Sequence, residues 1–326
     1  SQTITLEMPT WIERDRNSQF RMARLKSDHA TVDWMSMFES GDGYRVRLIP
    51  HSNKVVTNTF SQLTPRPRYR VQANSLGFRS PEPDGFATDS DLRIMIFGDS
   101  SSFGWGVEQD EMYSSKLSEI LSQRLGNKSA KVINFAIPGE SSEYGRLLVK
   151  RFLPEYAADL VIFGFGANDA KPVFVPHTAQ VESFEAHAKL HSLRYWVSKS
   201  SLFRSLEAAV SNISRVDSTP GELPTRSAAV PLRRYLQNLS SMAKHAHKRH
   251  SAKSLFLNLC TPGNYAKRAR RIAERDGHLY LNGQAYLKRQ IPLLESGALK
   301  PAQIEAMKKE YGAQLERNQI FLISDD

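Results

Sequence analysis

The sequence contains a single cysteine, Cys260, among its 326 residues, so no disulfide can form within the chain. No run approaches the roughly eighteen uninterrupted apolar residues of a membrane span, so no integral membrane segment is expected. The first residues, SQTITLEMPTW, lack the basic-then-apolar order of a secretory signal. Because 40% of the residues are hydrophobic and 24% are charged, the chain is expected to fold around a sizeable core.

Acidic residues are fewer than basic ones, and the formal net charge is +10. The basic residues gather locally, as in KHAHKRH over 244–250 and KRARR over 267–271. No recognition motif accompanies these runs, so nucleic acid is not expected as a partner. Such runs are typical of solvated helix faces, beside which an acidic polysaccharide or a lipid surface would be tolerated.

Residues 1–90 differ from the rest of the chain in their pattern of polar and apolar residues. Alternating polar and apolar residues in YRVRLI over 44–49 and in RYRVQA over 68–73 predict short half-buried strands. The segment NSLGFRSPEP over 74–83 predicts a turn in which Gly77 takes a conformation that other residues avoid. We therefore expect an N-terminal β-rich extension over 1–90, followed by an α/β domain over 91–326.

From Arg93 onward, apolar strands alternate with amphipathic helices, which predicts a doubly wound, flavodoxin-like parallel sheet with helices on both faces. The expected strands cover 94–97, 132–135, 160–164, 254–259 and 278–281. Apolar residues at helical spacing predict helices around 117–125, 144–152, 232–243 and 304–315. The stretch 171–231 is long for one crossover and contains DSTPGELPTRSAAVP, so a helical insertion is expected there.

Polar residues follow three successive strands of the predicted sheet. The first strand ends in Gly98-Asp99-Ser100, the second runs into NFAIPGESS with Gly139, and the third runs into GFGAND with Asn168. Ligands of such sheets bind outside the carboxyl ends of the strands. Acyl transfer needs a nucleophile and hydrogen-bond donors aimed at an oxyanion. Each block alone would more readily be a turn, a cap or a loop glycine, but their joint occurrence favours a catalytic site.

The blocks FGDSSSFGWGV, NFAIPGESS and GFGAND, in this order and separation, resemble those of the SGNH (GDSL-type) hydrolases. The resemblance extends from about residue 93 to the C-terminus. It implies a serine hydrolase with Ser100 as nucleophile, with Ser100, Gly139 and Asn168 as the oxyanion hole, and with neither a metal nor an organic cofactor. The segment NSLGFRSPE is also similar to the join before the serine block in many bacterial members, often envelope-associated ones, which favours an extracytoplasmic location.

The family's fourth block, Asp-x-x-His, supplies the general base and its supporting carboxylate. The sequence ends in QIFLISDD, and either Asp325 or Asp326 would open this block. The catalytic histidine is then expected two or three positions beyond Asp326. His278 is a poorer candidate because a single residue separates it from Asp276. Without a base the serine hydroxyl would be a poor nucleophile.

These observations predict a serine esterase whose substrate is an acyl ester, preferably a carbohydrate O-acyl ester. Phe103 and Trp105 would either line an acyl or sugar site or pack in the core. A polysaccharide O-acyltransferase is an alternative, because a sugar hydroxyl in place of water could resolve the acyl-enzyme. A catalytically inactive binding module with the same fold is another.

Overall fold

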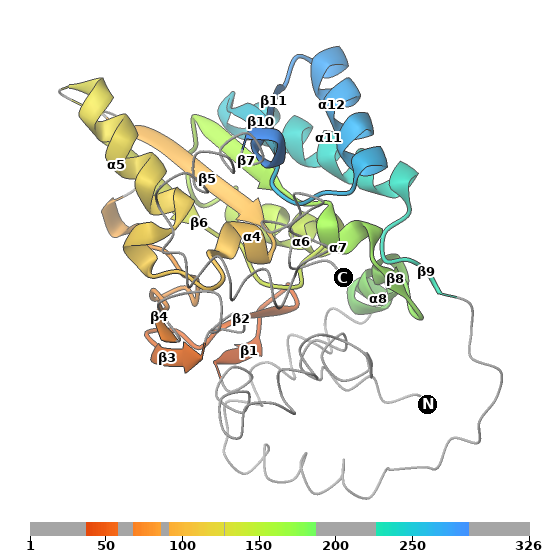
Figure 1. Ribbon diagram of the computed structural model, residues 1–326, viewed down its shortest axis with the longest axis horizontal. Helices are drawn as coiled ribbons and strands as arrows, with labels where there is room; N and C mark the ends of the chain where they lie inside the picture. Colours follow the sequence, from red (N-terminus) through yellow and green to blue (C-terminus); the bar gives the residue numbers. More distant parts are fainter. Residues whose placement is uncertain (1–36, 58–67, 86–90, 127, 187–225, 287–326) are drawn as a thin grey trace, which may run out of the picture.

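A computed structural model describes residues 37–57, 68–85, 91–126, 128–186 and 226–286. In this part of the chain, five parallel strands form one sheet in the order β11-β10-β7-β5-β6 (Figure 1). They are β5 (Leu92–Gly98), β6 (Ala130–Asn134), β7 (Leu160–Gly164), β10 (Lys253–Asn258) and β11 (Leu279–Asn282). This is the strand order of the flavodoxin-like doubly wound fold, so the predicted fold class is confirmed.

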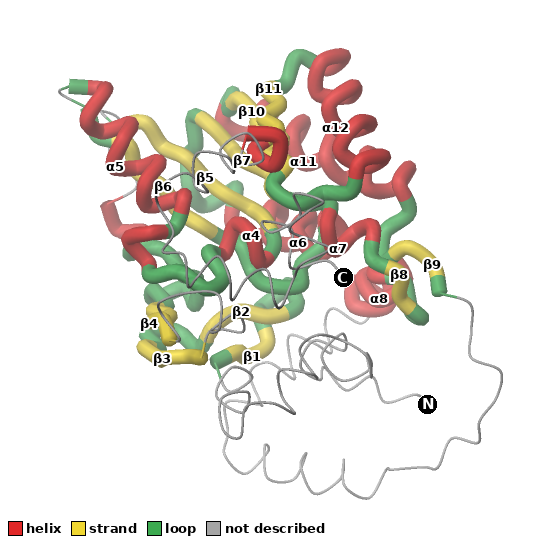
Figure 2. The backbone as a smooth tube through the Cα atoms, in the orientation of Figure 1, coloured by secondary structure: helices red, strands yellow, loops and turns green. Residues whose placement is uncertain are grey.

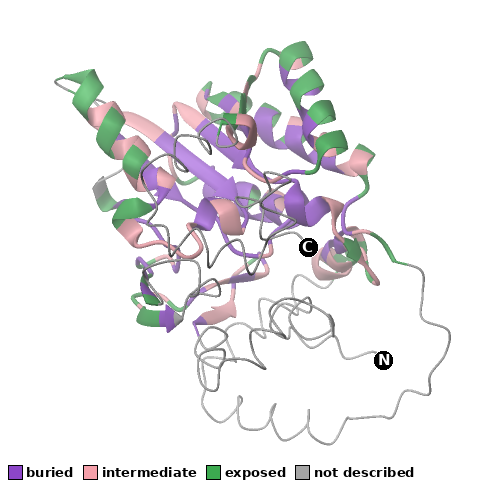
Figure 3. Ribbon diagram, viewed as in Figure 1, coloured by how far each residue is buried: buried purple, intermediate pink, exposed green. Residues whose placement is uncertain are grey.

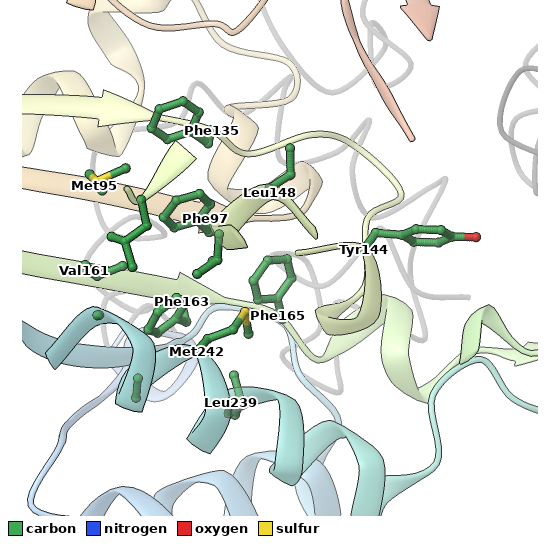
Figure 4. Packing of buried hydrophobic residues seen from close by; sticks show 14 of the residues in the cluster. Met95, Phe97, Phe135, Tyr144, Leu148, Val161, Phe163, Phe165, Leu239 and Met242 are labelled. Atoms are coloured by element: carbon green, nitrogen blue, oxygen red, sulfur yellow. The ribbon is translucent and has the colours of Figure 1, made fainter. Parts of the chain in front are cut away.

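Both faces of the sheet are covered, because apolar side chains alternate to the two sides of each strand. Met95 and Phe97 of β5 pack into a cluster with apolar residues of three helices, α6 (Ser142–Phe152), α11 (Leu232–His250) and α12 (Gly263–Asp276) (Figure 4). Ile94 and Ile96 face the other side, toward Leu117 of α5 (Tyr113–Leu125). Figure 3 shows the resulting buried sheet between helices whose outer surfaces are exposed.

The helices expected around 117–125, 144–152 and 232–243 are confirmed as α5, α6 and α11. Helix α5 ends at Gly126, and α12 ends at Gly277, whose φ of 73° is the left-handed conformation that glycine adopts readily at such ends. Within the expected insertion over 171–231 lie β8 (Pro172–Val173), α8 (His177–Ala186) and β9 (Ser227–Ala228). The remainder of the insertion and the helix expected over 304–315 fall outside the described residues.

The N-terminal region forms two antiparallel pairs, β1 (Phe38–Ser40) with β2 (Val46–Leu48) and β3 (Asn53–Thr57) with β4 (Arg68–Gln72). Both expected strands are therefore present. Figure 2 shows these pairs below the five-stranded sheet in this view. A short helix, η1 (Pro83–Gly85), follows them.

The expected turn over 74–83 is also confirmed. Gly77 has a φ of 81°, and a Cβ atom there would lie 2.3 Å from the Leu48 carbonyl oxygen, so only glycine fits this position. Next to it, Phe78 packs edge-on against Phe135 in the main core, with ring centroids 5.0 Å apart. The N-terminal strands thus share a core with the sheet, while a division of the chain at residue 90 stays a prediction. No helix in the described ranges is both long and apolar enough to span a membrane.

Candidate active site

Strand β5 runs directly into a one-turn helix, α4 (Ser100–Phe103), which the sequence did not predict. Asp99 is its N-cap, because one carboxylate oxygen accepts hydrogen bonds from the Ser101 backbone N–H at 3.0 Å and from the Ser101 hydroxyl at 2.6 Å. Ser100 is the first residue of the helix, and its side chain is partly exposed. The cap therefore holds Ser100 at the carboxyl edge of the sheet without using its hydroxyl.

Glycines at the ends of β5 and β7 let this helix lie across the sheet edge. A Cβ atom built on either Gly98 or Gly164 would come 2.5 Å from the Ser102 hydroxyl oxygen, so any larger residue would push α4 away. The Ser102 hydroxyl also accepts a hydrogen bond from Tyr113 at 3.0 Å. The glycine of the Gly-Asp-Ser block is thus explained by the close approach of the helix that carries Ser100.

The second block forms a tight turn beside the first. The Ile137 backbone N–H donates to the Gly98 carbonyl at 3.1 Å, and the Glu140 N–H closes the turn onto the Ile137 carbonyl at 3.3 Å. Gly139 has a φ of 76°, and with Pro138 before it the turn has the residue pattern of a type II turn. Gly139 therefore lies in a fixed turn that hydrogen bonds to the last residue of β5.

The third block is joined to both of the others. The Asp99 backbone N–H donates to the Gly164 carbonyl at 3.3 Å. Asn168, on the short helix α7 (Ala167–Ala170), is buried and donates from its side-chain nitrogen to the Glu140 carbonyl at 3.0 Å. An amide nitrogen carries two hydrogens, so one is left to donate elsewhere. Asp325 and Asp326 lie outside the described residues.

A network of buried polar groups lies behind Asn168 and was not anticipated from the sequence. The Asp169 carboxylate accepts from the Ser142 backbone N–H at 3.1 Å and from the Ser142 hydroxyl. The Asn238 side chain donates to the Ser142 hydroxyl at 3.0 Å and to Glu143 at 2.6 Å, and Glu143 is paired with Arg234. Burial raises the pKa of Asp169 to about 7, although the hydrogen bonds from Ser142 oppose this shift.

This raised pKa predicts a pH-dependent effect of Asp169→Asn on stability. In the folded protein Asp169 keeps its proton up to about pH 7, whereas in the unfolded chain it loses the proton near pH 4. The wild type therefore loses stability as the pH rises between these values, and an asparagine does not titrate. We expect the free energy of unfolding of the variant to rise by about 4 kcal/mol relative to wild type between pH 4 and pH 8, because the two pKa values differ by about three units. Urea unfolding measures this difference.

Asp159→Asn is the matched control for that measurement. Asp159 is partly exposed and paired with Arg93, and the hydrogen bond from Arg93 lowers the pKa of Asp159. The ionised Asp159 stabilises the folded protein, and this stabilisation appears as the pH rises from 3 to 5 and the carboxyl loses its proton. The control variant lacks this carboxyl, so over the same range it should lose stability relative to wild type. A constant difference between wild type and Asp169→Asn across the range would show that Asp169 titrates normally.

An arginine from the N-terminal region reaches the turn that contains Gly139. The Arg45 side chain donates to the Glu140 carboxylate at 3.1 Å and lies 4.2 Å from the centre of the Tyr144 ring. Burial raises the pKa of Glu140 to about 7 against the effect of Arg45. Burial also disfavours the charge of Arg45, but Glu140 and Tyr144 outweigh it and raise the Arg45 pKa. An arginine guanidinium stays positively charged in proteins. The hydrogen bond from Arg45 therefore favours the ionised form of Glu140 at neutral pH.

The aromatic residues after Ser100 do not share one role. Phe103 is completely buried among N-terminal residues such as Val71, whereas Trp105 is partly exposed at the edge of the same cluster. Core packing is therefore the correct reading for Phe103. His177 is buried and hydrogen bonds to the Ser141 hydroxyl at 3.0 Å, and burial lowers its pKa to about 3.

Comparisons with known proteins bear on the family and the fold of the chain. The model of the GDSL-like Lipase/Acylhydrolase family matches residues 96–288. An arylesterase of Vibrio mimicus is 28% identical over 90 residues, which are 28% of this chain and 44% of that protein. The aligned part thus spans less than half of the length of this relative.

Solved structures with a similar fold include esterases. AlinE4, an SGNH-hydrolase family esterase, is 17% identical, with a TM-score of 0.36 over 71% of this chain and 98% of that one. The psychrotrophic esterase EstA from Pseudoalteromonas sp. is 17% identical, with a TM-score of 0.37 over 70% of this chain and 98% of that one. TesA is also 17% identical, with a TM-score of 0.36 over 70% and 98% of the two chains.

Proposed function

Because the chain belongs to the GDSL-like Lipase/Acylhydrolase family, we propose that it is a serine ester hydrolase that forms an acyl-enzyme on Ser100. In the first step the Ser100 hydroxyl oxygen attacks the ester carbonyl carbon and gives its proton to a base. The C–O bond to the alcohol then breaks, and the alcohol leaves with that proton. In the second step water attacks the acyl carbon and gives a proton to the base. The C–O bond to the Ser100 oxygen then breaks, this oxygen takes up the proton, and the carboxylic acid leaves.

The oxyanion formed in each step needs donors fixed in advance. We assign this role to the backbone N–H groups of Ser100 and Gly139 and to the Asn168 side chain. One observation carries the proposal: the Asn168 side chain donates to the Glu140 carbonyl at 3.0 Å, within the turn that contains Gly139. The bond from the Ile137 N–H to the Gly98 carbonyl and the bond from the Asp99 N–H to the Gly164 carbonyl tie these two blocks to the segment that leads into Ser100. This supports a shared site for the three residues.

The general base is assigned to a histidine of the fourth block, opened by Asp325 or Asp326. This assignment rests on the sequence resemblance. It is consistent with the position of His177, whose lowered pKa and hydrogen bond to Ser141 suit a neutral buried side chain better than a proton acceptor that must become charged.

A covalent labelling experiment on the full-length protein tests the assignment of the nucleophile. A fluorophosphonate probe should react at Ser100, because an activated serine forms a P–O bond while the P–F bond breaks and fluoride leaves. Fragmentation mass spectrometry of the peptide over 94–116 should place the added mass on Ser100. Ser101→Ala should be labelled as the wild type is. A label on another residue, or no label on folded protein, would contradict the proposal.

Within this function we propose a carbohydrate O-acyl ester as the substrate. The likeness of NSLGFRSPE to the join found in envelope-associated bacterial members supports this choice. The protein should then release acetate from an acetylated polysaccharide faster than it releases fatty acid from a long-chain acyl ester at equal ester concentration. If the acetyl group instead appears on an added polysaccharide acceptor and little free acetate forms, the protein is an acyltransferase with the same site.

A further inference from the structure

A second arginine of the N-terminal region contacts the backbone that follows Ser100. Arg79 comes from the turn over 74–83, and its side chain is almost completely buried, with 1% of the residue exposed. One terminal nitrogen of its guanidinium donates to the Phe103 and Gly104 carbonyls, and the other donates to Arg70 at 2.8 Å and to Val107 at 2.6 Å. Burial of a positive charge removes its hydration, which costs free energy unless hydrogen bonds replace it. Here four backbone carbonyls accept hydrogen bonds from the guanidinium.

Two of these carbonyls, those of Phe103 and Gly104, lie at the end of the helix that begins at Ser100. The backbone N–H groups of Gly104 and Trp105 both point to the Ser100 carbonyl oxygen. Arg79 therefore holds the C-terminal end of this one-turn helix, where carbonyl groups are otherwise unpaired and a positive charge is favourable. Arg79 is thus linked to Ser100 by two hydrogen bonds: its side chain donates to the Gly104 carbonyl, and the Gly104 N–H donates to the Ser100 carbonyl.

Only an arginine suits this position. Its guanidinium carries donors in a rigid planar fork, and here the two ends of the fork reach carbonyls on β4 and on the loop after α4. The guanidinium carbon also lies 5.4 Å from the centre of the Phe103 ring and 5.5 Å from that of Tyr69. A lysine ammonium is a single point charge, so it would reach fewer of these carbonyls from one place.

We propose that Arg79 is a positioning residue for the nucleophile: it fixes the segment 100–107, and through it the orientation of Ser100, from the N-terminal extension. The catalytic consequence rests on the proposed function of Ser100. The contacts by which Arg79 holds the segment 100–107 in place do not depend on that function, because they concern the fold alone. Under this proposal the extension is part of the active-site scaffold, and Arg79 acts without touching the substrate.

The test combines kinetics with hydrogen exchange on the full-length protein. In Arg79→Met, kcat for p-nitrophenyl acetate should fall about ten- to a hundredfold, as expected when a reacting group is displaced by about 1 Å, while KM changes less than about threefold. Arg79→Lys should recover part of kcat. Amide exchange should become faster in 100–108 in both variants, and exchange in β7 should remain at the wild-type rate.

Two control variants separate positioning from general loss of stability. Ile272→Ala on α12 creates a cavity in the main core, and Arg93→Met breaks the pair with Asp159 at the amino end of β5. Both should lower the melting temperature and keep kcat within about twofold of wild type. If they lower kcat as much as Arg79→Met at a similar melting temperature, the proposal is wrong.

The remaining outcomes also decide the question. If Arg79→Met does not fold, Arg79→Lys is judged by the same two criteria. If the wild type hydrolyses no ester, the proposed function fails, but the exchange comparison still applies. Wild-type exchange rates over 100–108 in a folded Arg79 variant would overturn the inference whatever the activity.

Discussion

Replacement of Ser100 by alanine is expected to lower kcat for p-nitrophenyl acetate by on the order of 10⁴-fold or more, because under the proposed function the acyl-enzyme forms on Ser100. The fold should survive the change. Ser100 occupies the first position of α4, while the cap of this helix is supplied by Asp99, and alanine is a good helix former. The measurement is steady-state hydrolysis by the full-length protein, with circular dichroism to verify folding.

Ser101→Ala is the matched control for this experiment. Its hydroxyl donates to Asp99 at 2.6 Å, so its loss removes one contact of the cap, while the backbone N–H of residue 101 still donates to Asp99. A modest loss of stability, about 1 kcal/mol, is expected, with kcat close to wild type. Comparable activity in Ser100→Ala and wild type would assign the chemistry to a different residue. Similar losses in both variants would indicate that the cap, and not the nucleophile, limits the reaction.

The sequence predicted the sheet well because each parallel strand is a short apolar run followed by a polar block. Buried strands leave this signal in the residues themselves, as in the run that ends at Gly98. The three strand-end blocks were placed correctly at one edge of the sheet for the same reason. Neighbouring parallel strands point their carboxyl ends to the same edge of the sheet. Residues far apart in the sequence therefore become neighbours there without any local signal beyond the strand itself.

The supporting contacts could not be predicted in the same way. Helix α4 is one turn long, too short for a periodic pattern, and the fit of Ser102 against Gly98 and Gly164 depends on the packing of two strands. Arg79 donates to carbonyl groups, which every residue has, so its partners leave no trace in the residue types at 103, 104 and 107. The sequence did mark the segment around Arg79 as unusual, but only the fold connects it to Ser100.

Replacement of Asn168 by alanine is expected to lower kcat on the order of a hundredfold or more, the usual effect of removing one oxyanion donor. KM should change little, because the donor acts mainly on the charge that develops in the transition state. The variant also loses the hydrogen bond to the Glu140 carbonyl, so the turn containing Gly139 should be held less firmly. Asn168→Asp keeps the size of the side chain but replaces a donor by a carboxylate that repels the oxyanion, and its loss should be at least as large.

Asn258 provides a comparison that isolates the role of the donor. It is also a buried asparagine near the carboxyl end of a strand adjacent to β7, and it hydrogen bonds to the Thr261 backbone N–H at 2.9 Å and to Asn282 at 3.1 Å. Asn258→Ala should cost stability through these lost contacts, about 1–3 kcal/mol, while kcat stays within a few-fold of wild type. If both asparagine variants lose kcat in proportion to their melting temperatures, Asn168 serves the fold and not the oxyanion. A loss of kcat confined to Asn168, at equal stability, is the result that a donor in the oxyanion hole requires.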